Sequence, residues 1–68
     1  MESFTIQLNG KEKKIYSKTL ELLIDKEGFN PLIVATAVNG VFIAREKRAD
    51  LQLKQNDTVE IVSPMQGG

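Results

Sequence analysis

The stretch that says most about the fold is residues 57–68, Asp57-Thr58-Val59-Glu60-Ile61-Val62-Ser63-Pro64-Met65-Gln66-Gly67-Gly68. Val59 and Ile61 alternate with polar residues at the period of a strand that buries one face. Pro64 has no amide hydrogen for a sheet ladder and should end this strand. The final glycines lack a Cβ and suit a narrow channel, so residues 63–68 are predicted to form a flexible tail that presents a carboxylate to another protein.

The composition excludes several classes of function. The 68 residues form one small predicted domain, 1–68, and contain no Cys or His. Disulfides, thiolate metal sites and the usual nucleophile–base pairs are excluded, so the chain is expected to be neither an enzyme nor a metal protein. Its nine basic and nine acidic residues balance, which argues against nucleic-acid binding. No signal peptide or membrane-spanning run is recognisable, so a cytoplasmic location is expected.

The first part of the chain predicts a hairpin. Apolar and polar residues alternate strictly over 3–8, Asn9-Gly10 suits a type I′ turn, and 13–16 returns as a second strand. Basic residues on this hairpin could dock an acidic partner, but they also keep an edge strand soluble, and this second interpretation is favoured. These residues are Lys11, Lys13 and Lys14.

A helix of about ten residues is predicted to follow the hairpin. Ser17 or Thr19 can cap its first turn, and Gly28 can end it in a left-handed conformation, with Pro31 preventing continuation. An apolar stripe with helical spacing should face the sheet. The stripe comprises Leu20, Leu23, Ile24 and the borderline Glu27, and Leu22 is expected to widen it.

A second hairpin is predicted after the helix. The apolar run 33–38 indicates a strand covered on much of both faces, and Asn39-Gly40 provides another tight turn into a short strand at 41–43. The small residues Ala35 and Ala37 would permit close approach either by the helix or by a partner, and both possibilities stay open here.

A polar crossing loop over 44–55, with one helical turn and anchors at Leu51 and Leu53, should lead to a turn at Asn56 and the closing strand. The predicted order is therefore strand, strand, helix, strand, strand, strand. This order predicts an α+β single domain of the β-grasp (ubiquitin-like) type, with a mixed five-stranded sheet packed on one helix. A right-handed crossover is expected to make the strand after the helix parallel to the first strand.

Several motifs along the whole chain resemble the sulfur-carrier proteins of thiamine biosynthesis, the ThiS family. They are Val38-Asn39-Gly40 before a short strand, Arg45-Glu46 after it, the strand 57–62, and the final Gly67-Gly68. The sequence departs from the family pattern at Arg48, where an aromatic residue is common, and at Asn56, where Gly is common. Arg cannot replace an aromatic anchor except by stacking or through its aliphatic stem, which leaves open what the crossing loop presents to a partner.

The resemblance implies a chemistry for the tail. An adenylyltransferase of the ThiF type, similar to ubiquitin-activating enzymes, would consume ATP to adenylate Gly68, and sulfur relayed by a cysteine desulfurase would convert it to a thiocarboxylate. A thiazole synthase of the ThiG type would then use that sulfur. The chain itself would bind no cofactor, and Met65, Gln66 and Gly67 would thread the partner's channel.

A partner surface is predicted at the base of the tail, on the sheet face away from the helix. Val62 and Phe42 alternate outward from core positions and, with Met65, would form an exposed apolar patch. Phe42 could instead be buried under the crossing loop. Arg45 and Glu46 could contact a partner or form a local ion pair of little energetic consequence.

Three classes of function fit these observations. The first is the thiamine sulfur carrier, and the second is the small subunit of molybdopterin synthase, whose members tend to be longer. The third is a ubiquitin-like modifier joined through Gly68 to lysines, or an interaction domain with accidental final glycines. A ferredoxin use of the fold is excluded, because an iron–sulfur cluster needs four cysteines.

Overall fold

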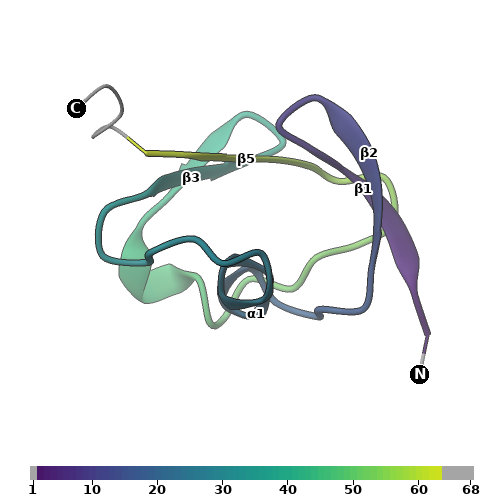
Figure 1. Cartoon of the computed structure of the whole chain (residues 1–68), viewed down its shortest axis with the longest axis horizontal. Coiled ribbons are helices and arrows are strands. Elements are labelled where there is room, and N and C mark those ends of the chain that lie inside the picture. The colour runs from purple at the N-terminus through teal and green to yellow at the C-terminus, as the bar shows by residue number, and fades with distance from the viewer. Residues whose placement is uncertain (1, 64–68) are drawn as a thin grey trace.

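The structure is a computed structural model, and it describes residues 2–63. Its elements follow the predicted order. They are β1 (Phe4–Leu8), β2 (Lys11–Ile15), α1 (Leu20–Lys26), β3 (Ala35–Val38), β4 (Val41–Ile43), a 3-10 turn η1 (Arg45–Lys47) and β5 (Thr58–Val62). Figure 1 shows α1 nearly end-on, on one side of the sheet. This is the predicted β-grasp arrangement, in which a single helix covers one face of a mixed sheet.

β5 is the central strand of the sheet. The strand order is β2-β1-β5-β3-β4, with β1 parallel to β5 and β3 antiparallel to it. The predicted parallel alignment of the strand after the helix with β1 is therefore wrong, because β3 runs in the opposite direction. The parallel neighbour of β1 is the closing strand, which the crossing loop brings into the middle of the sheet.

The ends of α1 explain why the helix is shorter than predicted. Thr19, not Ser17, is the N-cap, and its Oγ1 accepts a hydrogen bond from the Leu22 amide at 3.2 Å. At the other end the amides of Gly28 and Phe29 donate to carbonyls of the last turn, both at 3.1 Å, with Gly28 at φ +82°. This Schellman motif ends the helix after seven residues.

Two predictions about buried apolar residues are wrong. Leu22 does not widen the buried stripe, because it lies at the flank of α1 and is 52% exposed. Ile33 is not part of a strand, since the Asn30-Pro31 turn extends through it. The side-chain oxygen of Asn30 accepts a hydrogen bond from the Leu32 amide, and its backbone carbonyl accepts one from the Ile33 amide. β3 therefore begins only at Ala35.

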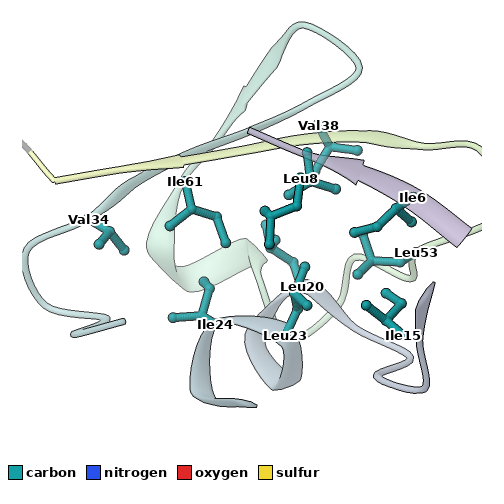
Figure 2. Close-up of a cluster of buried hydrophobic side chains, with 11 residues drawn as sticks. Ile6, Leu8, Ile15, Leu20, Leu23, Ile24, Val34, Val38, Leu53 and Ile61 are labelled. Carbon is teal, nitrogen blue, oxygen red and sulfur yellow. The ribbon is translucent and has the colours of Figure 1, made fainter. Parts of the chain in front are cut away.

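The core lies between α1 and the sheet. Figure 2 shows Ile61 on β5 directed toward Ile24 of the helix, with Leu20 and Leu23 beside them. Leu53 of the crossing loop is buried in the same cluster and Leu51 packs against it, as predicted. The eleven members are Ile6, Leu8, Ile15, Leu20, Leu23, Ile24, Val34, Val38, Leu53, Val59 and Ile61.

Candidate partner-binding surface and tail base

The face of the sheet opposite α1 carries an apolar patch at the end of β5. Phe42 is 68% exposed and Val62 is 56% exposed. In the β-ladder Ala37 pairs with Phe42 on one side, and Ala35 pairs with Val62 on the other. We call Phe42, Val62, Ala35 and Ala37 the open-face patch. They line a shallow depression together with Glu60 and Thr36.

The small residues of β3 create this depression. Thr36 and Val38 are buried on the helix side, so the alternating Ala35 and Ala37 lie on the open face. Two methyl groups between the larger Phe42 and Val62 leave a shallow hollow. The structure thereby decides the alternative that the sequence left open, because the alanines face away from α1.

The predicted site residues do not all come together. Phe42 and Val62 share the open face, and the crossing loop does not cover Phe42. Arg45 instead lines a groove between α1 and the loop that follows it, together with Leu22 and Leu32. The predicted tail residues Met65, Gln66, Gly67 and Gly68 lie outside the residues that the structure describes, as does the predicted flexibility of the tail after Ser63.

Arg48 is a buried crosslink rather than part of a docking surface. Its side chain is only 4% exposed and donates three hydrogen bonds, from Nε to Thr36 Oγ1 at 3.2 Å and from the terminal nitrogens to two carbonyls. These carbonyls belong to Pro31, at 3.0 Å, and Val34, at 2.8 Å. Arg48 therefore ties the crossing loop to the segment between α1 and β3.

The guanidinium of Arg48 has a lowered pKa, because it is buried and lies near another positive charge. Burial lowers the pKa of its guanidinium, the nearby charge of Arg45 lowers it further, and Glu21 acts in the opposite direction. The Thr36 hydroxyl in turn donates a hydrogen bond to the Ile43 carbonyl at 2.9 Å, which extends the network to β4. Sequence reasoning missed this role, because an Arg in a polar loop normally indicates a solvated position.

Both Asn-Gly turns adopt the predicted conformation and also contact β5. Asn9 and Asn39 have φ values of 51° and 52°, and each is followed by a glycine with positive φ. Asn39 donates from Nδ2 to Asp57 Oδ1 at 3.0 Å and accepts from the Thr58 amide at 2.9 Å. Asn9 makes the corresponding contacts near the other end of β5, at Ile61. The turn motif gave no signal of these distant bonds.

The acidic residues form no group of three or more that could hold a metal ion in residues 2–63. Asp57 is 5% exposed, and its second oxygen accepts from the Lys54 amide at 2.8 Å, so it stabilises the turn before β5. That turn contains Asn56 with a φ of 71°, as the sequence predicted. Of the three hairpin lysines, Lys11 and Lys13 share one face of β2 and line a common hollow, whereas the alternating Lys14 lies on the other face. Lys13 forms an ion pair with Glu27 at 3.5 Å.

None of the helices in the described part of the chain has both the length and the apolar character needed to cross a membrane. Comparison with known proteins gives a family and a solved structure. A family model described as the ThiS family matches residues 6–68. A crystal structure of the thiamine biosynthesis protein ThiS from Geobacter metallireducens is 28% identical and superposes with a TM-score of 0.75, over 96% of this chain and 100% of that one. No curated protein matches the sequence.

Proposed function

Because the chain belongs to the ThiS family, we propose that it is a sulfur carrier of thiamine biosynthesis whose Gly68 carries the sulfur. The observation that supports this proposal most directly is the position of the open-face patch. β5 ends at Val62, a member of the patch, and the sequence then runs through Ser63 into the glycine-terminated segment. A partner docked on the patch would therefore hold the base of the segment that enters its active site.

The proposed chemistry begins with activation of the Gly68 carboxylate. One carboxylate oxygen attacks the α-phosphorus of ATP in an adenylyltransferase of the ThiF type, and pyrophosphate leaves. The resulting mixed anhydride makes AMP the leaving group, which a sulfur nucleophile displaces at the acyl carbon. A cysteine desulfurase is the proposed source of that sulfur, delivered as a persulfide whose terminal sulfur attacks the acyl carbon. The acyl disulfide formed in this way would be cleaved by a thiol, which leaves as a disulfide and releases the thiocarboxylate.

The thiocarboxylate is a soft nucleophile that a thiazole synthase of the ThiG type would consume. The chain would act in these steps as a co-substrate and not as a catalyst, binding no cofactor of its own. Its lack of Cys and His supports this view, since the usual nucleophile–base pairs need one of them. Its contribution would be to present one carboxylate, in extended chain, at a fixed distance from a docking surface.

The open-face patch is proposed to dock the activating enzyme. Exposed aromatic and aliphatic side chains around a small hollow are typical of the anchor points of protein interfaces. Glu60 lies opposite Ala37 in the ladder and adds a carboxylate at the border of the hollow. A complementary partner would insert an apolar side chain over Ala35 and Ala37, and place a basic group near Glu60.

Deletion of Gly68 tests the proposal directly. Intact-protein mass spectrometry follows the chain after incubation with the activating enzyme, ATP and a sulfur source. The wild-type chain should gain the mass difference of one oxygen exchanged for sulfur, in its C-terminal peptide. The deletion variant should stay folded and gain nothing, and Gly67→Ala should slow the reaction because a methyl group restricts φ and crowds the channel.

Two outcomes would contradict the sulfur-carrier proposal. An unchanged wild-type mass with an activating enzyme of demonstrated competence would exclude thiocarboxylate formation. An isopeptide bond from Gly68 to a lysine would identify a protein modifier instead. Consumption of the thiocarboxylate by a molybdopterin synthase large subunit, and not by a thiazole synthase, would assign the carrier to the molybdenum cofactor.

A further inference from the structure

The ladder between β1 and β5 stops before β5 ends. Gln7 pairs with Thr58 and Leu8 with Val59, after which the chain turns away at Asn9-Gly10. On its other edge β5 stays paired with β3 as far as Val62. Without a group in place of β1, the last residues of β5 would therefore be hydrogen-bonded along a single edge, the one that faces β3.

The side chain of Asn9 provides that replacement. Its Oδ1 accepts from the Ile61 amide at 2.9 Å, and its Nδ2 donates to the Ile61 carbonyl at 3.0 Å. The backbone amide of Asn9 itself donates to the Val59 carbonyl at 2.9 Å. The carboxamide thus offers one acceptor and one donor, as a strand residue would, and extends the pairing along β5 from Val59 to Ile61.

The equivalent turn at Asn39 directs its side-chain amide to a different part of β5. Asn39 has nearly the same φ, is also followed by glycine, and binds the opposite end of β5. Its side-chain amide accepts a hydrogen bond from the Thr58 backbone amide and donates one to the Asp57 carboxylate, at the start of the strand. Only Asn9 lies next to the residues from which the C-terminal segment departs.

We infer that Asn9 is a positioning residue, whose side-chain amide fixes the end of β5 and thereby the place where the C-terminal segment leaves the sheet. The inference rests on the proposed function. The seven residues 62–68 can span at most about 24 Å when fully extended. If the end of β5 opens, the base of this segment moves relative to the docked patch, and the carboxylate occupies the reactive position less often.

Two substitutions distinguish the effect of the Asn9 side-chain hydrogen bonds from the effect of its turn conformation. Asn9→Gly keeps a residue that adopts positive φ but removes both side-chain hydrogen bonds. Asn9→Asp keeps an acceptor for the Ile61 amide and loses the donor to its carbonyl, so it should have an intermediate effect. Asn39→Gly is the matched control, because it makes the same change in the equivalent turn at the other end of β5.

Hydrogen exchange measures the local effect. In Asn9→Gly the Ile61 amide should exchange about tenfold to a hundredfold faster than in the wild type, while the Thr58 amide changes little. In Asn39→Gly the order should be reversed. Unchanged Ile61 exchange in Asn9→Gly would overturn the inference at its structural step, whatever the function of the chain.

The functional effect is measured as adenylation of the carrier by a ThiF-type enzyme with ATP, at several carrier concentrations. Asn9→Gly should lower kcat by about tenfold with KM within twofold of the wild type, because docking on the patch is intact but delivery is not. Asn39→Gly should leave kcat within about twofold, since it does not touch the end of β5. Asn9→Asp should recover part of the lost rate.

Other outcomes of the kinetic measurements would overturn the positioning role of Asn9. Equal losses of kcat in Asn9→Gly and Asn39→Gly would indicate a general stability effect, and a rise in KM alone would indicate a docking residue; both overturn the positioning role. Wild-type kcat in Asn9→Gly would do the same. Failure of the wild-type chain itself to be adenylated would refute the proposed function, and the exchange experiment would still report on the local role of Asn9.

Discussion

The apolar side chains on the two faces of the sheet differ sharply in exposure. Ile61 and Val62 are neighbours on β5, yet Ile61 is 1% exposed beneath α1 and Val62 is 56% exposed on the open face. The side of the sheet that the single helix covers supplies the core. The other side retains an apolar patch that stays exposed, and exposed patches of this kind commonly mark interfaces.

The largest effect on stability is expected from the covered face. Ile61→Ala should lower the free energy of unfolding by about 3 kcal/mol, through lost burial and a residual cavity. Since a single core of this size rarely supplies more than about 3–5 kcal/mol, much of the variant should be unfolded at room temperature. Val62→Ala, the matched change one residue later, should cost less than about 1 kcal/mol. Urea denaturation of both variants measures the difference, and similar losses would contradict the assignment of the two faces.

An intermediate effect is expected from Arg48, which holds the loops around the covered face together. Arg48→Met keeps an aliphatic chain but leaves the Pro31 and Val34 carbonyls without their donor, so it should cost roughly 1–3 kcal/mol. Arg48→Lys should recover only part of this loss, because an ammonium cannot reach all three acceptors in the fork geometry of a guanidinium. The surface change Arg45→Met is the control and should have little effect.

The pH dependence of the Arg48 effect follows from its lowered pKa. Burial first, and then Arg45, disfavour the charged form in the folded state, so the unfolded chain holds this proton more tightly. Stability would therefore rise with pH only at strongly alkaline pH, where the guanidinium begins to lose its proton. Between about pH 6 and 8 both states keep the proton, and the wild-type minus Arg48→Met difference should be constant. A slope in this range would indicate a second titrating group.

The smallest effect on stability, and a large one on binding, is expected from the open face. Phe42→Ser should change the free energy of unfolding by less than about 0.5 kcal/mol, since the side chain is 68% exposed. It should weaken binding of the activating enzyme at least about tenfold, as an aromatic anchor would. Val41→Ser is the matched control, because Val41 is 62% exposed but lies on the other side of β4. Denaturation and calorimetric titration give both quantities, and unfolding of Phe42→Ser, or equal binding losses in the two variants, would argue against the patch.

Local patterns in the sequence predicted most of the architecture. The alternation in β1 and β5, the helical spacing of Leu20, Leu23 and Ile24, and the Asn-Gly dipeptides act over a few residues, so the elements and turns could be inferred. The open-face positions of Phe42 and Val62 followed from the same alternation. Helix length and the start of β3 were missed, because caps and the Asn30 turn shift boundaries by a few residues.

The sequence by itself determined the elements, their order, the single small domain and the absence of Cys and His, because these depend on composition and on contacts between near neighbours. Only the tertiary structure decided the opposite direction of β3, the burial of Arg48 and the separation of Arg45 from the open-face patch. It also decided that Asn9 completes the end of β5, through bonds between residues 52 positions apart. Such contacts depend on which segments meet in space, and no local pattern of residues specifies that meeting.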